Sequence, residues 1–468
     1  MSAPHSPLFT DLYELTMCRG YFAQGMHARP SCFDLFFRKQ PFEGGFTVAA
    51  GLADALAFLS DLRFSATDLA YLRSLNLFAD EYLAHLREFV FSGDVQAMPE
   101  GTIAFPGEPL LRVQGPLEQC QLVESALLNI VNFQTLIATK AARVCLQAGF
   151  DNVLEFGLRR AQGPDGAWMA ARAAYIGGCV ATSNVQAGAD LEIPVRGTHA
   201  HSWVMAFDSE LEAFRAFAAV FPTNSILLVD TYDTLASGVP NAIAVAREMR
   251  ERGETLRGIR LDSGDLARLS REARRMLDEA GLPEVKIFAS GDLDETVIEQ
   301  LNMAGARIDV YGVGTRLVTG DQDPALTGVY KLAAIADEQG VWRNTRKKSD
   351  SLEKATLPGI KQVWRLHDQR GMIADWIELE PFAPEPTQAV PGYLPSETAP
   401  RQFTGIVQAQ PLLQTCMRAG KTLSPQPTLP DIRAHAIANL KQLPEPVRRL
   451  ANPAPYPVTL GPRLWSEM

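Results

Sequence analysis

A short stretch at residues 197–203, Gly-Thr-His-Ala-His-Ser-Trp, places two histidines and two hydroxyl side chains close together. The chain contains only seven histidines, so the pairing of His199 with His201 stands out. Histidine changes charge near neutral pH, which suits it to proton or phosphoryl transfer. Such a turn can also do no more than satisfy neighbouring backbone groups. The surrounding sequence favours chemistry, with Thr198, His201 and Ser202 as the candidate residues.

Polar residues of similar kinds follow other apolar, β-rich stretches of the chain. The groups are Glu155 with Arg159 and Arg160; Thr182, Ser183 and Asn184; Asp230 and Asp233; Arg260, Asp262, Ser263 and Asp265; Ser290, Gly291 and Asp292; and Gly312, Gly314 and Thr315. Each group stands where a predicted strand ends. Because active sites of α/β barrels lie at the carboxyl ends of the strands, we expect these groups to share one site.

The arginines and the glycines of these groups indicate an anionic ligand. Arg159, Arg160 and Arg260 offer bidentate contacts to a carboxylate or phosphate, although each could instead pair with a nearby acid. The loops with Gly291 and Gly314 follow the last two predicted strands, where barrels commonly bind phosphate through backbone N–H groups. The combination favours a phosphorylated sugar.

Two aspartates that follow one strand have two possible uses. Asp262 and Asp265 could hold Mg²⁺, which prefers one or two carboxylates together with substrate phosphates, or they could hold ribose hydroxyls. Asp265 and Ser263 could equally cap the helix that begins near Gly264. We expect both uses to be present.

The elements that position these groups alternate regularly. Strands are predicted at 153–160, 179–184, 194–198, 226–231, 258–263, 286–290 and 309–314. Helices are predicted near 166–176, 185–192, 208–220, 240–252, 265–280 and 293–304. This alternation predicts a parallel sheet, and the number of strands is close to that of an α/β barrel.

The length of 468 residues predicts more than one domain. We expect an α/β fold with three parts: an N-terminal α/β domain at 1–140, an irregular α/β barrel at 141–327, and a C-terminal extension at 328–468 that packs back on the N-terminal domain.

Composition narrows the classes of partner. The net charge of −10 argues against nonspecific binding to nucleic acid, which depends on Lys and Arg contacts to phosphates. The six cysteines have no metal-binding spacing, and no stretch has the roughly 18 continuous apolar residues of a membrane span. We therefore expect a soluble, cytoplasmic protein that acts on small molecules.

Eight stretches distributed through nearly the whole chain, taken together, resemble nicotinate phosphoribosyltransferase, a type II phosphoribosyltransferase. They are TDLYELTM at 10–17, FDLFFR at 33–38, EFGLRRAQG at 155–163, GTHAHSW at 197–203, LVDTY at 228–232, RLDSGD at 260–265, GVGT at 312–315 and VYKL at 329–332. The resemblance implies an N-terminal α/β domain joined to an irregular α/β barrel. It also implies the reaction of nicotinate with phosphoribosyl pyrophosphate to give nicotinate mononucleotide and pyrophosphate. This reaction is the first step of NAD salvage from nicotinate, with ATP as cosubstrate and Mg²⁺ as cofactor.

The resemblance also implies roles for individual residues. His201 matches the histidine that ATP phosphorylates, and Asp262 stands with it as the second catalytic residue. The residues expected to bind nicotinate are Tyr13, Arg159, Thr198, Ser202 and Arg260. The residues expected to bind phosphoribosyl pyrophosphate are Ser290, Gly291, Gly314 and Thr315. The resemblance implies that Tyr13 reaches the site from a partner subunit, so a homodimer is expected.

Three alternatives stay open at this stage. A nicotinamide phosphoribosyltransferase would carry an acid near Thr182-Ser183-Asn184, and none stands within that triplet. A quinolinate phosphoribosyltransferase is much shorter and lacks the ATP-coupling histidine. A noncatalytic barrel that binds sugar phosphates would have no use for a histidine that can be phosphorylated.

Overall fold

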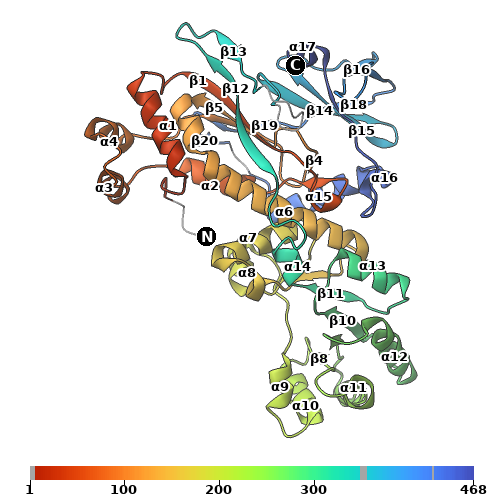
Figure 1. The fold of residues 1–468 in the computed structure, drawn as a ribbon. Coiled ribbons are helices and arrows are strands. Elements are labelled where there is room, and N and C mark those ends of the chain that lie inside the picture. The colour runs from red at the N-terminus through yellow and green to blue at the C-terminus, as the bar shows by residue number, and fades with distance from the viewer. Residues whose placement is uncertain (1–5, 348–355, 424–425) are drawn as a thin grey trace. The chain divides into compact units, whose positions relative to one another are not determined.

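The computed structural model describes residues 6–347, 356–423 and 426–468. The chain forms two compact units (Figure 1): the first comprises residues 1–139 and 325–468, and the second comprises residues 140–324. Helices and strands are mixed in both units. The predicted α/β class is therefore confirmed.

A seven-stranded sheet forms the centre of the first unit, in the order β13-β12-β1-β5-β3-β19-β20. Its strands are β1 (Pro30–Phe37), β3 (Asp94–Ala97), β5 (Leu111–Pro116), β12 (Gly328–Ala336), β13 (Trp342–Asn344), β19 (Gln414–Arg418) and β20 (Lys421–Thr422). All residues of β1 except Pro30 are buried, because β1 lies inside the sheet between β12 and β5. The Phe-rich sequence of β1 suits this position.

Smaller sheets complete the first unit. A four-stranded sheet has the order β18-β14-β15-β21, and two further pairs are β16-β17 and β2-β4. The strands are β2 (Thr47–Val48), β4 (Ile103–Ala104), β14 (Lys361–Asp368), β15 (Gly371–Leu379), β16 (Val390–Gly392), β17 (Arg401–Phe403), β18 (Gln408–Pro411) and β21 (Val458–Leu460). The region 380–403, which its prolines predict to be a linker, therefore contains two paired strands.

Several helices accompany these sheets in the first unit. They are α1 (Leu12–Ala23), η1 (Pro41–Glu43), α2 (Leu52–Ser60), α3 (Ala66–Ser74), α4 (Asp80–Arg87), α5 (Leu117–Leu122), α15 (Leu429–Gln442), α16 (Glu445–Arg448) and α17 (Pro462–Ser466). The long helix α6 (Glu124–Ala148) runs from the first unit into the second. Within the described residues, no helix combines the length and the apolar character that crossing a membrane requires.

The second unit contains a six-stranded sheet in the order β7-β6-β11-β10-β9-β8, and every pair in it is parallel. The strands are β6 (Val153–Glu155), β7 (Ala181–Thr182), β8 (Ile226–Leu228), β9 (Gly258–Leu261), β10 (Lys286–Ser290) and β11 (Val310–Val313). Six of the seven predicted strands are thus present, and most are shorter than predicted. Arg260 and Ser290 are still paired within their strands, whereas Asp230 and Asp262 lie beyond the last paired residues.

The prediction of a strand at 194–198 is wrong. Only one bridge forms in this segment, between Val195 and Thr182 on the edge strand β7. Pro194 has no N–H to donate, and the hydroxyl of Thr198 donates to the carbonyl of Ile226 in β8. Backbone pairing in the described structure therefore runs from β7 to β8 without closing into a barrel.

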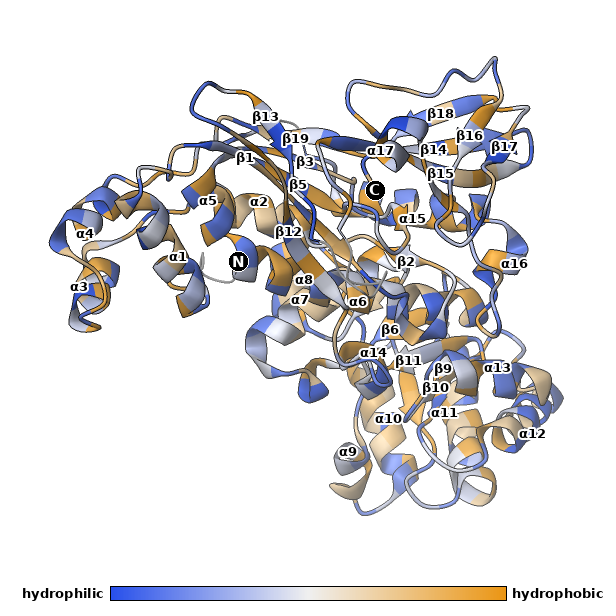
Figure 2. Ribbon diagram, turned by 45° about the horizontal axis from the view of Figure 1, so that its top comes forward, coloured by the Kyte–Doolittle hydropathy of each residue, from blue (hydrophilic) through white to orange (hydrophobic). Residues whose placement is uncertain are grey.

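Helices alternate with the strands of the second unit. They are η2 (Leu158–Arg160), α7 (Gly163–Ile176), α8 (Val185–Leu191), α9 (His201–Met205), α10 (Glu210–Val220), η3 (Thr234–Gly238), α11 (Val239–Glu251), α12 (Leu266–Glu279), α13 (Glu295–Met303) and α14 (Thr315–Val318). The spacing of Leu266, Leu269, Ala273 and Leu277 predicts an apolar face for α12, and all four residues are buried. Figure 2 shows hydrophilic and hydrophobic residues alternating along this helix.

Candidate active site

His201 is the first residue of α9, and its side chain is 37% exposed. Its Nε2 lies 3.1 Å from Oδ1 of Asp230, whose side chain is almost fully buried. Asp230 stands two residues beyond β8, so the strand end holds the carboxylate in place. A carboxylate accepts hydrogen bonds and does not donate them, so Nε2–H donates and the neutral ring has its lone pair at Nδ1. The pair is suited to transfer of a proton or a phosphoryl group.

Asp230 also connects the histidine to the next strand. Its Oδ2 accepts a hydrogen bond from the backbone N–H of Asp262 and another from the hydroxyl of Ser263, each at 2.8 Å. Asp230 therefore fixes His201 and the loop after β9 relative to one another. Asp230 belongs to the strand-end groups that the sequence predicts to share one site, but the resemblance assigned it no role.

Arg260 lies in β9 and is held on three sides. Its Nε donates to Oγ of Ser290 at 2.8 Å, its Nη2 donates to Oδ1 of Asp262 at 2.7 Å, and its Nη1 lies 3.4 Å from the carbonyl of His199. Both acceptor side chains come from strand ends, so the guanidinium has little freedom to turn. Only 17% of the Arg260 side chain is exposed.

Asp262 is held as a carboxylate. Burial opposes its ionisation, but hydrogen bonds from Ser290 and Arg260 outweigh burial and hold the pKa of Asp262 below its ordinary value. Asp265 lies three residues further on, and its Oδ1 accepts the N–H of Arg268 at 2.9 Å. Asp265 is therefore the N-cap of α12, which is one of the two uses expected for it.

Gly291 follows Ser290 in a turn that only glycine fits. Its φ is +93°, and a Cβ at this position would lie 2.3 Å from the carbonyl oxygen of Asp262. The turn thus presses the loop after β10 against the loop after β9. Gly314 follows β11, where a Cβ would lie 3.1 Å from the carbonyl oxygen of Phe156, and Thr315 begins the short helix α14.

The other predicted site residues have less defined surroundings. Arg159 is exposed on η2, and Ser202 is exposed on α9. Thr198 is half-buried and uses its hydroxyl on the carbonyl of Ile226. Tyr13 is 47% exposed on α1, in the first unit. The structure therefore brings together His201, Arg260, Asp262, Ser290 and Gly291. Thr198 lines a cavity with Arg260 and Ser290, and the other predicted residues lie on separate loops or helices.

The triplet 182–184 is bound into the sheet by a buried acid. Glu155 accepts the hydroxyl of Thr182 at 2.5 Å through Oε2, and it accepts the N–H of Gly157 through Oε1. Burial raises the pKa of Glu155. Asn184 caps α8 by accepting the N–H of Ala187 at 3.1 Å. Both Glu155 oxygens are thus engaged by the chain itself.

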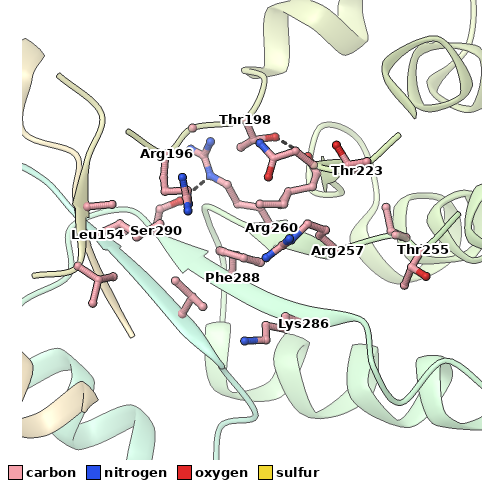
Figure 3. Close-up of a pocket in the computed structure, with 18 of the residues that line it drawn as sticks. Leu154, Arg196, Thr198, Thr223, Thr255, Arg257, Arg260, Lys286, Phe288 and Ser290 are labelled. Atoms are coloured by element: carbon pink, nitrogen blue, oxygen red, sulfur yellow. Dashed lines mark hydrogen bonds between the residues drawn. The ribbon is translucent and has the colours of Figure 1, made fainter. Parts of the chain in front are cut away.

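A cavity of about 720 Å³ lies beside these residues in the second unit. Figure 3 shows Thr198, Arg196, Arg260 and Ser290 around one part of it, while Lys286 and Arg257 come from the beginnings of β10 and β9. Leu154, Phe156 and Phe288 supply apolar walls. Phe156 and Arg196 were not predicted, although each adjoins a predicted site stretch.

Within the described part of the chain, no group of three or more His, Cys, Asp or Glu side chains could hold a metal ion. A metal at this site would therefore need further ligands from water or substrate. Mg²⁺ usually binds in this way, through one or two carboxylates together with substrate phosphates.

The fold and site together define a class of protein. A parallel α/β sheet that presents a fixed arginine to a cavity, and a tight glycine turn and a histidine–aspartate pair at its strand ends, is a binding site for small anionic ligands, of the kind found in α/β enzymes. Family models for nicotinate phosphoribosyltransferase match three parts of the chain: its N-terminal domain at residues 8–132, the family's own model at 152–349 and its C-terminal domain at 360–468. The chain belongs to the nicotinate phosphoribosyltransferase family, which confirms the resemblance inferred from the sequence.

Individual relatives agree over nearly the whole length. The chain is 45% identical to the nicotinate phosphoribosyltransferase of Bacillus subtilis over 462 residues, covering 98% of this chain and 94% of that protein. It is 38% identical to the human nicotinate phosphoribosyltransferase over 518 residues, covering 98% and 95%. The crystal structure of human nicotinic acid phosphoribosyltransferase matches with a TM-score of 0.86 at 35% identity, covering 98% and 99%. A nicotinate-nucleotide pyrophosphorylase from Pyrococcus furiosus shares the fold at 23% identity, with a TM-score of 0.70 and coverage of 92% and 94%.

Proposed function

We propose that the protein is a nicotinate phosphoribosyltransferase. The ring nitrogen of nicotinate forms a bond to the anomeric carbon of phosphoribosyl pyrophosphate, the bond from that carbon to pyrophosphate breaks, and nicotinate mononucleotide and pyrophosphate leave. The observation that carries the proposal is the fixed guanidinium of Arg260, which lines the cavity in a chain of this family. The reaction would begin NAD salvage from nicotinate.

Recognition of a carboxylate is supported by two guanidinium groups at the cavity. Arg260 and Arg196 both line it, and a guanidinium matches the geometry of a carboxylate. No acid stands within Thr182-Ser183-Asn184, where a nicotinamide enzyme would accept amide hydrogens, and the neighbouring Glu155 already accepts from Thr182 and Gly157. Phe156 and Phe288 give apolar walls suited to a pyridine ring.

Negative charge develops on the pyrophosphate as it leaves, and the site must stabilise this charge. We assign this part of the work to Ser290, Gly291, Gly314 and Thr315, which stand after β10 and β11. Asp262, held in its ionised form, would hold Mg²⁺ together with Asp265. The ion, when bound, would neutralise charge on the phosphate oxygens of the substrate.

We assign ATP coupling to His201. In this step the bond from the γ-phosphorus of ATP to its bridging oxygen breaks, a bond from phosphorus to the imidazole forms, and ADP leaves. Water later attacks the phosphorus and releases phosphate from the histidine. The geometry favours Nδ1 as the nucleophile, because Nε2–H is donated to Asp230. Asp230 would also stabilise the positive charge that the ring acquires.

A product assay tests this proposal. The protein is incubated with phosphoribosyl pyrophosphate and Mg²⁺, with nicotinate and nicotinamide offered in parallel, each with and without ATP. We expect nicotinate mononucleotide, formed faster with ATP, and little product from nicotinamide. Equal use of nicotinamide would contradict the carboxylate assignment. Ligand binding without any product would indicate a noncatalytic sugar-phosphate-binding protein.

A further inference from the structure

The outer edge of β8 exposes backbone groups that need partners. Ser225 accepts from Arg257 through its carbonyl, and Val229 donates its N–H to the carbonyl of Arg260, so the groups of these odd-numbered residues face β9. Backbone groups alternate in direction along a strand, so the carbonyl of Ile226 and the N–H of Leu228 face the opposite edge. No strand of the described structure pairs with that edge.

Two side chains from the segment that failed to form a strand meet these groups. The hydroxyl of Thr198 donates to the carbonyl of Ile226, and the N–H of Leu228 donates to Nε2 of His199 at 3.2 Å. In a parallel ladder, one residue of the neighbouring strand donates to one carbonyl and accepts from the N–H two residues further on. The side chains of Thr198 and His199 therefore take the place of one residue of a seventh strand.

The imidazole of His199 is the tautomer that the hydrogen bond from Leu228 requires. Since Nε2 accepts, the proton is on Nδ1, which lies 3.3 Å from the carbonyl of Ala200. The residue is only 7% exposed, and its ring lies edge-on to Phe217 with 4.7 Å between the ring centroids. Burial lowers the pKa of His199 to about 4, so the ring is neutral at physiological pH.

We propose that His199 is a positioning residue, which joins residues 195–199 to β8 and thereby sets His201 and Arg260 in place. His201 follows it by two residues and meets Asp230, which lies two residues beyond the Leu228 that His199 contacts. The carbonyl of His199 also faces Nη1 of Arg260 at 3.4 Å. One buried contact thus aligns the phosphorylated side chain with the arginine of the substrate site. The effect on ATP coupling rests on the proposed function above.

Two substitutions separate the hydrogen bond from simple packing. His199→Phe keeps a ring against Phe217 but leaves the N–H of Leu228 without an acceptor. His199→Gln offers a side-chain oxygen near the position of Nε2. Loss of a buried hydrogen bond predicts that His199→Phe reduces the rate stimulation by ATP about tenfold. His199→Gln should retain most of that stimulation.

Hydrogen exchange gives a readout that does not depend on activity. The peptide that contains Ile226 and Leu228 should exchange faster in His199→Phe than in the wild type, and His199→Gln should restore protection. His435→Phe serves as the control, because it replaces a half-buried histidine in the first unit. It should leave ATP stimulation and the exchange of this peptide unchanged. If His199→Phe does not fold, Thr198→Val tests the same connection between residues 195–199 and β8, because it removes only the hydrogen-bond donor to Ile226.

The two proposals fail in different ways. Unchanged ATP stimulation together with unchanged exchange in His199→Phe would overturn the role of His199. If ATP does not stimulate the wild type, the coupling proposal is wrong. The hydrogen exchange of this peptide alone then decides whether His199 joins residues 195–199 to β8.

Discussion

Arg260 shows how single side chains define this site. Its contacts with Ser290 and Asp262 hold the guanidinium before any substrate arrives, so little side-chain freedom is lost on binding. The same contacts keep Asp262 ionised. A guanidinium fixed beside a cavity is therefore the best candidate in the second unit for recognising the carboxylate of nicotinate.

Replacing Arg260 tests this recognition directly. A hydrogen bond to a charged group contributes about 1.5–3 kcal/mol, so Arg260→Ala should raise the KM for nicotinate roughly 10- to 100-fold. Arg260→Lys should also raise it, because lysine keeps the charge but loses the planar fork. Initial rates at varied nicotinate concentration measure the effect. An unchanged KM in Arg260→Ala would move the carboxylate contact to Arg196 or Arg159.

The roles of the two aspartates after β9 can be distinguished by replacing each aspartate with asparagine. Asn is as good a helix cap as Asp, so Asp265→Asn should leave the melting temperature nearly unchanged. If Asp265 also binds the metal, the Mg²⁺ concentration for half-maximal rate should rise severalfold in this variant, and more strongly in Asp262→Asn. Titration of activity with Mg²⁺ is the measurement. Unaltered Mg²⁺ dependence in Asp265→Asn would leave that residue with the capping role alone.

At the scale of elements, the loops after parallel strands bring the site together. The loop after β10 approaches the loop after β9 so closely that only Gly291 fits between them. This contact sets Ser290 against Asp262, and through Asp262 it sets Arg260. The geometry of the site therefore depends on a turn as much as on the residues that meet substrate.

A glycine pair in the same unit isolates the effect of this contact. Gly291 and Gly281 both have positive φ, but a Cβ at Gly281 would meet no atom within 4 Å. Gly281→Ala should therefore cost only the backbone penalty of about 1–2 kcal/mol. Gly291→Ala should lower the melting temperature further and raise the KM for phosphoribosyl pyrophosphate. Equal effects of the two substitutions on that KM would show that the close approach has no functional role.

Local patterns predicted most elements of the second unit, because alternating apolar strands and amphipathic helices leave a period in the sequence. The same patterns failed at residues 194–198, where side chains replace the strand ladder, and this substitution leaves no period. Arg260, Asp262 and Ser290 could be predicted because they lie at or near the carboxyl ends of strands. The partnership of His201 with Asp230, and that of His199 with β8, depend on distances between strands, which local sequence does not contain.

At the scale of the whole molecule, residues far apart in sequence complete one unit. Strand β12 pairs with β1, and residues 325–468 share a unit with residues 1–139. A buried ionic group joins these segments: Asp34 in β1 contacts Arg112 in β5, and it also contacts Lys361 in β14. Burial opposes ionisation of Asp34, but the two cations outweigh burial and lower the pKa of Asp34.

Lys361→Met should therefore destabilise the first unit. Removing one partner from a buried ion pair costs about 3–5 kcal/mol. Lys421→Met, at an exposed position, is the matched control and should change the free energy of unfolding by less than about 0.5 kcal/mol. Urea denaturation measures both variants. A loss below about 1 kcal/mol in Lys361→Met would contradict the assigned role of the buried group.

The pH dependence of this difference has a definite sign. A carboxylate with a lowered pKa stabilises the folded state above its ordinary value of 3.8, and that contribution is lost as the pH falls through the lowered pKa. Stability of the wild type should therefore exceed that of Lys361→Met most clearly above about pH 4. The difference should shrink in more acidic solution. A constant difference between pH 3 and pH 7 would mean that Asp34 does not carry the effect.

We propose above that His201 couples ATP hydrolysis to the formation of nicotinate mononucleotide. The most direct test measures the rate of product formation with and without ATP in the wild type and in His201→Ala. We predict ATP-stimulated synthesis in the wild type, and slow synthesis that ATP does not stimulate in His201→Ala. Full ATP-dependent turnover in His201→Ala would contradict the claim.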